Sequence, residues 1–155
     1  MRLTVLAVGR LKRAPEAALT AERLERATQA GRGLGLGPTR LIEIDERKAR
    51  GPAAEAAALL AAAPDGPLAA LDERGAALSS PELAERLARW RDQGARDLAF
   101  AVGGADGHGE ALRTRTAFTL SFGRMVWPHR LARAMLAEQL YRAISILAGS
   151  PYHRE

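Results

Sequence analysis

Short apolar segments recur along the chain, and patterns typical of amphipathic helices separate them. Four of the segments predict buried strands, at residues 3–8, 41–44, 68–71 and 98–102. Two further strand-like pieces are expected on either side of Gly123, at 118–122 and 124–127. Strands that alternate with helices predict an α/β fold, in which a mostly parallel sheet is flanked by helices.

The helical patterns have recognisable starting residues. Proline opens the first two helices, and a Ser-Pro pair opens the third, with Ser80 as the expected N-cap and Pro81 in the first helical position. The last helix carries an apolar stripe that includes Leu136 and Leu140. The expected helices cover residues 15–30, 52–63, from Ser80 to near Gly94, a short piece from about Glu110, and from about Arg130 to Leu147.

Unusual sequence follows three of the strands, at 71–75, 103–107 and 125–129. Because ligands bind at the carboxyl ends of strands in such sheets, these segments are expected to meet at one site. Residues 103–109 hold four glycines in seven positions, which lets a ligand approach the backbone. The spacing fits neither a dinucleotide-binding fingerprint nor a P-loop, and a plain turn remains the alternative.

The composition favours one domain, covering residues 1–155, with 47% hydrophobic residues and a net charge of +5. The charge is uneven, because residues 1–50 carry 11 basic and 6 acidic side chains whereas residues 51–100 carry 5 and 8. Residues 101–155 carry 7 basic and 4 acidic side chains. A basic face built from the two ends would suit a polyanionic partner, and an ordinary solvated surface is the alternative.

Several classes of protein are disfavoured. The chain has no cysteine, which excludes disulfides and thiolate chemistry. Its three histidines lie on separate segments without metal-ligand spacing, and no serine hydrolase elbow is present, so no metal is expected. The apolar run near the start is too short for a signal peptide, and no run is long enough to cross a membrane. We therefore expect a soluble cytoplasmic protein without membrane contact.

Two polar segments stand out near the end of the chain. Pro128-His129 precedes the last helix, whose N-terminus should lower the pKa of His129, although helix entry alone could explain the pair. The last residues, Pro151-Tyr152-His153-Arg154-Glu155, combine groups suited to stacking on a base and holding phosphate. A disordered tail is the alternative for this second segment.

These motifs together resemble a known family. The chain is similar from end to end to the ribosomal RNA large subunit methyltransferase H family, which belongs to the SPOUT class. The motifs that carry the resemblance are Leu71-Asp72-Glu73-Arg74-Gly75 with Ser79-Ser80, Val102-Gly103-Gly104, Pro128-His129, Glu138-Gln139-Leu140-Tyr141-Arg142-Ala143 and Pro151-Tyr152-His153-Arg154-Glu155.

The resemblance implies an α/β fold with a C-terminal trefoil knot and an obligate homodimer. It implies that S-adenosylmethionine binds in the knot, held largely by backbone groups. The implied reaction is methylation of N3 of a pseudouridine in 23S rRNA, in the large subunit of the assembled ribosome. The cofactor contacts carried over by motif matching are Leu71, Gly103, Phe122, Gly123, Arg124, Met125, Val126 and Trp127.

The chain departs from the family pattern in two places. The family usually shows Ser-x-Met-Thr-Leu-Pro-His, where this chain has Gly123-Arg124-Met125-Val126-Trp127-Pro128-His129. The glycine loop reads Ala105-Asp106-Gly107-His108-Gly109, where a shorter Gly-x-x-Gly-Leu is typical. Both departures fall on segments that the resemblance places near the cofactor.

Methyl transfer needs a positioned nucleophile that loses one proton. We expect Arg142 and Arg154 to position the base and phosphate, Tyr152 to stack, and His153 or His129 to take the proton. Arg130 and Arg133, together with Tyr152 and Arg154, are expected to contact RNA, and the tail is expected to reach across the dimer. The two alternatives are a catalytically silent ribosome-binding factor of the same fold and an α/β enzyme acting on a small molecule.

Overall fold

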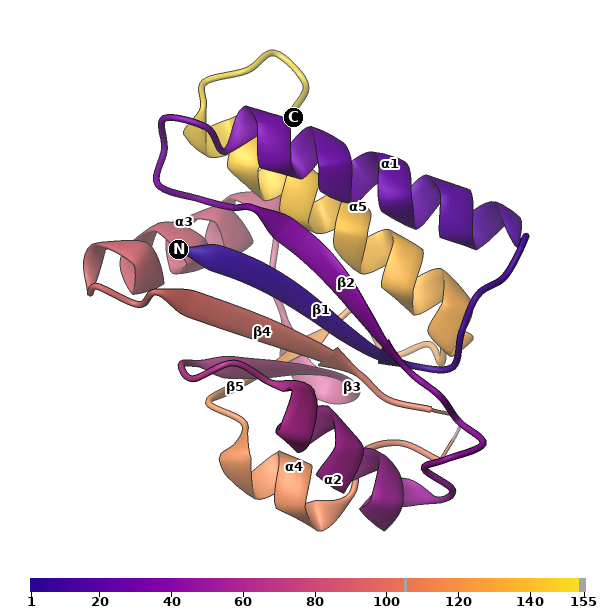
Figure 1. The fold of residues 1–155 in the computed structure, drawn as a ribbon. Helices are drawn as coiled ribbons and strands as arrows, with labels where there is room; N and C mark the ends of the chain where they lie inside the picture. The colour runs from indigo at the N-terminus through magenta and orange to yellow at the C-terminus, as the bar shows by residue number, and fades with distance from the viewer. Residues whose placement is uncertain (105, 154–155) are drawn as a thin grey trace.

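The predicted alternation of strands and helices builds one parallel sheet in the computed structural model, which describes residues 1–104 and 106–153 (Figure 1). Within these residues the sheet has five strands in the order β2-β1-β4-β3-β5, and every neighbouring pair is parallel. The expected fold class is therefore confirmed. The strands are β1 (Arg2–Val8), β2 (Thr39–Ile44), β3 (Leu68–Ala77), β4 (Asp97–Val102) and β5 (Phe118–Ser121).

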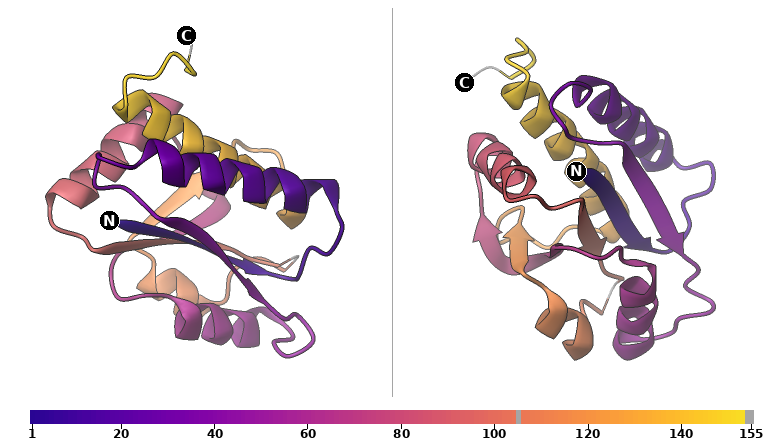
Figure 2. Two further views of the ribbon diagram at one scale, coloured as in Figure 1. Left: turned by 45° about the horizontal axis from the view of Figure 1, so that its top comes forward. Right: turned by 60° about the vertical axis from the view of Figure 1, so that its left-hand side comes forward.

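Helices cover both faces of the sheet (Figure 2). Three of them pack together on one face, where α5 contacts both α1 and α3, while α2 and α4 pack against each other on the opposite face. Parallel strands need this double cover because each strand must be buried on two sides. The helices are α1 (Pro15–Ala30), α2 (Pro52–Ala62), α3 (Ser80–Asp92), α4 (Glu110–Arg115) and α5 (His129–Leu147).

The core follows the two-residue period of the strands. In β4, Leu98 and Phe100 belong to the apolar cluster beneath α5, whereas Ala99 and Ala101 belong to the cluster beneath α2. Every residue of β4 is buried. The central strand is therefore rigidly held, and the loop that leaves it at Gly103 starts from a fixed position.

Three local expectations were wrong. Ser79, not Ser80, caps α3, because its extended backbone lets its hydroxyl accept from the amide of Glu82 at 3.3 Å while the Glu82 carboxylate accepts from the Ser79 amide at 2.7 Å. Residues 124–127 form no strand. The strand starting at Leu68 does not end at Leu71 but continues to Ala77 after an irregularity.

Two predictions concern the chain as a whole: a C-terminal trefoil knot, and the absence of a membrane-spanning segment. The sheet order is consistent with a C-terminal trefoil knot, which stays a prediction. Among the helices of residues 1–104 and 106–153, none combines the length and the apolar composition that a membrane span requires.

Candidate active site

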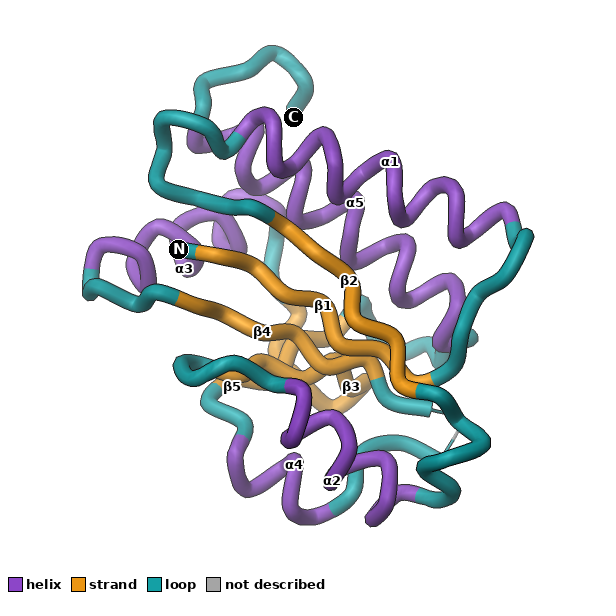
Figure 3. The backbone as a smooth tube through the Cα atoms, viewed as in Figure 1, coloured by secondary structure: helices purple, strands orange, loops and turns teal. Residues whose placement is uncertain are grey.

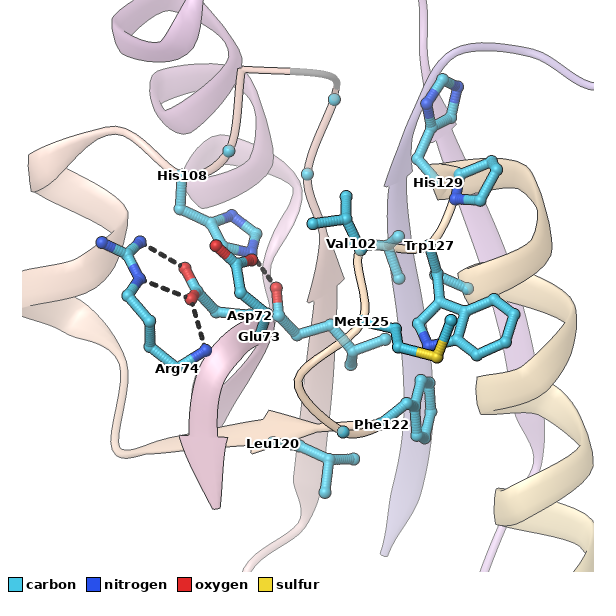
Figure 4. Close-up of a pocket in the computed structure, with 18 of the residues that line it drawn as sticks. Asp72, Glu73, Arg74, Val102, His108, Leu120, Phe122, Met125, Trp127 and His129 are labelled. Atoms are coloured by element: carbon cyan, nitrogen blue, oxygen red, sulfur yellow. Dashed lines mark hydrogen bonds and ion pairs between the residues drawn. The ribbon is translucent and has the colours of Figure 1, made fainter. Parts of the chain in front are cut away.

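The three segments expected to meet do line one cavity at the carboxyl edge of the sheet (Figure 4). The lining residues of these segments are 71–74 in the irregular part of β3, 102–104 and 106–108 after β4, and 122–123 and 125–129 between β5 and α5. The cavity measures about 660 Å³, which lies within the usual range for sites that bind small molecules and cofactors. Strand order alone brings these segments together, since β4, β3 and β5 are neighbours in the sheet.

The irregularity in β3 shapes the first wall. Leu71 and Ala76 both pair with Leu120 of β5, so residues 72–75 leave the ladder. A Cβ atom on Gly75 would lie 2.7 Å from the carbonyl oxygen of Thr119, which explains why glycine stands there. The strand thereby loops into the cavity without ending.

Asp72 and Arg74 form an ion pair within this loop. Its carboxylate accepts two hydrogen bonds from the Arg74 guanidinium, at 2.8 and 2.7 Å, and a third from the Arg74 amide at 3.0 Å. These bonds lower the pKa of Asp72 to about 2, against an opposing effect of burial. Asp72 and Arg74 therefore line the cavity wall as an ion pair, in which each charge offsets the other.

His108 forms the second wall together with the glycine segment. Its buried ring donates from Nε2 to the carbonyl oxygen of Leu71 at 2.7 Å, which requires the proton on Nε2 and leaves Nδ1 unprotonated. Burial lowers the pKa of His108, so the ring is neutral. A Cβ atom on Gly103 would lie 3.0 Å from the His108 ring, so glycine allows the ring to close against the end of β4. His108 thus joins the first part of β3 to the end of β4.

The third wall of the cavity, which follows β5, is apolar and largely exposed to solvent. Met125 and Val126 are 71% and 83% exposed, and Trp127 is 39% exposed. Such exposure of large apolar side chains beside a cavity is typical of a surface that another molecule covers. His129 follows at the first residue of α5, and its pKa is lowered by burial and by the charges of Arg133 and Arg130. The direction agrees with the expectation, and the neutral ring can accept a proton.

Most of the residues predicted to hold a cofactor lie at this cavity. Leu71, Gly103 and five residues of 122–127 line it, whereas Arg124 is exposed and does not. Their contact with a ligand stays a prediction. The carried-over motifs did not assign Asp72, Arg74, Asp106, Gly107 or His108 to the lining, although the polar strand end and the run of glycines mark them in the sequence.

The residues predicted to contact RNA or to act in catalysis lie in separate parts of the molecule. His129 lines the cavity, but Arg142 lies 13 residues further along α5, about 20 Å away along the helix axis. Tyr152 and His153 follow the C-terminal end of α5, whereas His129 and Ala132 at the N-terminal end of this helix line the cavity. Arg154 lies outside the described residues. One copy of the chain therefore does not bring residues 151–153, the described part of its tail, to its own cavity.

The tail packs on its own chain. The Tyr152 hydroxyl lies 2.9 and 3.0 Å from the two Glu138 carboxylate oxygens, and the Arg142 guanidinium donates to Glu138 at 2.8 Å. The Tyr152 ring lies 4.5 Å from that of Tyr141, between centroids, and 4.7 Å beneath the Arg142 guanidinium. Arg23 of α1 also pairs with Glu138, at 2.9 Å. The expected stacking residue is thus held by a charged cluster.

The expected RNA contact of Arg133 is corrected by the structure. Its side chain is fully buried, and it donates to Glu43 at 2.6 Å and to the carbonyl oxygens of Val8 and Gly9 at 2.9 and 3.0 Å. It joins α5 to the ends of β1 and β2 and has no access to RNA. Arg130, one turn earlier, is exposed. Within residues 1–104 and 106–153, no cluster of His, Asp or Glu could hold a metal ion.

A parallel α/β sheet with a glycine-lined cavity at its carboxyl edge is typical of α/β proteins that bind a ligand at this edge. Comparisons with known proteins identify the family within this class. A model of the family described as "Predicted SPOUT methyltransferase" matches residues 1–153, and the chain belongs to this family. S-adenosylmethionine is accordingly its cofactor, and the predicted family is confirmed.

Curated relatives match over the whole chain. A protein of Roseobacter denitrificans named ribosomal RNA large subunit methyltransferase H is 59% identical over 155 residues, covering 99% of both chains. A protein of the same name from Paracoccus denitrificans is 58% identical over 156 residues, covering 100% of both. A probable methyltransferase from Bordetella pertussis Tohama I has a TM-score of 0.51 at 18% identity, covering 92% of this chain and 94% of that one, which shows the fold alone.

The cavity fits S-adenosylmethionine in its size and in its donor set. Leu71, Val102, Leu120 and Phe122 give apolar walls that suit a flat heteroaromatic ring, and Gly103 and Gly104 leave backbone groups accessible. Asp72 is already paired with Arg74, so the fit rests on the apolar walls and on the backbone groups. Seven of the eight residues predicted to contact the cofactor line this cavity, and their contact with it stays a prediction.

Proposed function

We propose that this chain methylates N3 of a pseudouridine in the 23S rRNA of the assembled ribosome, in the cytoplasm, using S-adenosylmethionine. The observation that carries the proposal is identity of more than half over the full length with relatives named ribosomal RNA large subunit methyltransferase H. The coarser statement, methylation of ribosomal RNA with this cofactor, follows from the same relatives and the family. The finer statement rests on the tail and strand-end motifs.

The residues at the cavity suit this chemistry. When bound, S-adenosylmethionine supplies a methyl group that leaves sulfur as it bonds to N3, so N3 must lose its proton. His129 is placed at the cavity lip with a neutral ring, which can receive this proton. His153 is the second candidate. Most of the acceleration would come from holding N3 in line with the methyl group.

The separation of cavity and tail supports a homodimer. Arg142 and the tail lie at one end of α5 and the cavity at the other, about 20 Å apart along the helix axis. A second copy in the opposite orientation would bring its Arg142 and Tyr152 to this cavity. It would also cover exposed apolar side chains near the cavity, among them Met125, Val126 and Leu131. Each active site would then use residues of both copies.

The first experiment measures transfer of labelled methyl to ribosomes that lack the modification, with free rRNA and small molecules in parallel. Label confined to 23S rRNA of intact ribosomes, and mapped to N3 of a pseudouridine, is the expected result. Label on a small molecule alone would replace the proposal with the small-molecule enzyme. Absence of both label and cofactor binding would favour the silent ribosome-binding factor.

The assigned roles are tested by separating turnover from cofactor binding. Arg142→Ala, His153→Ala and Arg154→Ala should each lower turnover at least tenfold, in line with the usual contribution of positioning and proton-transfer groups. Cofactor affinity, measured by calorimetry, should change little. Equal losses of turnover and cofactor affinity would contradict these roles.

A further inference from the structure

A second, smaller hollow lies beside the cavity at the same edge of the sheet. It measures about 260 Å³, and polar side chains dominate its lining. The residues come from the loop after β1, the loop after β2 and the first turn of α5, and the loops lie together at this end of the sheet (Figure 3). Its charged members are Arg10, Lys12, Asp45, Glu46, Arg47 and Arg130. We call this hollow the basic groove.

The basic groove and the cavity are adjacent. His129 lines the cavity and Arg130, the next residue, lines the groove. A Cβ atom on Gly9 would lie 2.7 Å from a carboxylate oxygen of Glu46 and 3.8 Å from Nε2 of His129, which places these two side chains near the same point. A polymeric ligand with one monomer in the cavity would therefore place the neighbouring monomer over the basic groove.

The charges of the groove are not balanced internally. It has four cations and two carboxylates, and Asp45 is already occupied by Arg47, whose guanidinium donates to it at 3.1 and 2.9 Å. This bonding holds the pKa of Asp45 well below its usual range. Within the described part of the chain, Arg10, Lys12 and Arg130 form no ion pair and are exposed. Three cations are thus available to an anion.

The loop after β1 carries two of these cations, and hydrogen bonds from buried side chains fix its backbone. The buried Arg133 donates to the carbonyl oxygens of Val8 and Gly9, directly before Arg10. Glu43 accepts from Arg133 at 2.6 Å and, through the same oxygen, from the amide of Leu11 at 3.0 Å. The backbone around Arg10 is therefore fixed, which lowers the entropy lost when a ligand binds.

We infer that the basic groove binds the phosphate backbone of the RNA next to the target nucleotide. This inference rests on the proposed function, since it concerns how that RNA is held. Arginine and lysine at the edge of a catalytic cavity suit phosphate oxygens, which accept charge-assisted hydrogen bonds. The groove provides cations without an aromatic platform among the residues that line it, so it positions the backbone and leaves base reading to the cavity and tail.

The test neutralises the three available cations together, as Arg10→Gln, Lys12→Gln and Arg130→Gln in one variant. The matched control neutralises three exposed arginines outside the carboxyl edge, as Arg32→Gln, Arg89→Gln and Arg96→Gln. For each protein, the KM for unmodified ribosomes and the cofactor affinity are measured at about 50 and about 200 mM KCl, a range over which phosphate contacts weaken strongly.

The groove variant should raise KM for ribosomes at least tenfold at low salt, and the salt slope should fall by roughly two to three, as expected for losing about three phosphate contacts. Cofactor affinity should stay unchanged, which also shows that the variant folds. A change in KM and slope no larger than that of the control would overturn the inference while the proposed function stands.

A second assay makes the groove testable without methyl transfer. Binding of a fluorescently labelled 23S rRNA fragment is followed by anisotropy, with the same two variants and the same salts. If the wild-type chain methylates no ribosome, the proposed function fails, but weaker fragment binding by the groove variant alone would still support an RNA groove. Equal fragment binding by all three proteins would refute it.

Discussion

Arg133 of α5 donates a 2.6 Å hydrogen bond to Glu43 of β2, and the Arg133 side chain is fully buried. The same guanidinium donates to the carbonyl oxygens of Val8 and Gly9, at the point where β1 ends. Removing one partner of a buried pair leaves the other without compensation and strongly destabilises a protein. This single side chain therefore stabilises the fold and positions the loop that carries Arg10.

We predict that Arg133→Met lowers the free energy of unfolding by about 3 kcal/mol, because two carbonyl groups and a partly buried carboxylate lose their donor. Urea denaturation measures the loss. Arg130→Met is the control, and since its side chain is exposed we expect a change within about 0.5 kcal/mol. Equal stability of the two variants would mean that Arg133 is dispensable to the fold.

The buried His108 predicts a pH dependence of stability. Its pKa is lowered in the folded state, chiefly by burial, so the unfolded chain binds more protons as the pH falls below the ordinary histidine value. Its contribution is complete above about pH 6.5 and is lost as the pH falls through the lowered pKa. The carboxylates of Asp72 and Glu55 oppose this shift, and Arg113 adds to it. Thermal melts between about pH 7.5 and 5 should show falling stability.

His108→Gln separates titration from bonding. The glutamine amide can still donate to the Leu71 carbonyl but does not titrate, so the loss of stability at low pH should shrink. The remainder should come from other groups, including His129, whose pKa is also lowered. An unchanged pH profile in this variant would exclude His108 as its source.

Gly75→Ala should disturb the loop that β3 sends into the cavity. The added Cβ would lie 2.7 Å from the Thr119 carbonyl oxygen, in backbone that has little freedom to move. We expect a loss of about 1–3 kcal/mol in stability, as for other overpacked sites, together with weaker cofactor binding. Denaturation and calorimetry measure the two effects. The control is Gly94→Ala, where the added Cβ meets no atom within 4 Å and only the positive φ of 87° adds strain.

A shared active site predicts complementation between two inactive variants. Gly103→Val should block the cavity, because the substituent would press on the His108 ring, and Arg142→Ala should disable the tail end of α5. In a random mixture, half of the dimers are mixed and each keeps one intact site, so roughly a quarter of wild-type activity should return. A mixture as inactive as its components, after verified subunit exchange, would argue that each chain completes its own site.

The sequence alone predicted the elements with good boundaries where the local signal was strong. The first helix runs from Pro15 to Ala30 as expected, because proline starts it and glycines follow it. The strand at 98–102 was found because a strand covered on both faces reads as a continuous apolar run. Errors arose where local signals compete, as between Ser79 and Ser80, since either can cap a helix.

The sequence also determined the candidate site in outline. Polar and glycine-rich segments after three strands predicted one site, because parallel strands end at the same edge of a sheet. The alternation of strands and helices predicted the α/β class, and the family resemblance then assigned the cofactor. These signals did not predict the loop that β3 forms at 72–75. A strand that leaves its ladder and rejoins it has no distinct hydrophobic pattern.

Only the tertiary structure decided the roles of the arginines. Arg130 and Arg133 look alike in sequence, one helical turn apart, yet one is exposed at the basic groove and the other is buried against Glu43. The helix period places both near the same face, but the partner of Arg133 is Glu43 of β2, 90 residues away in sequence, and no local pattern reveals it. Local sequence therefore determined which elements form and where the site lies, and long-range packing determined which charges remain available to a ligand.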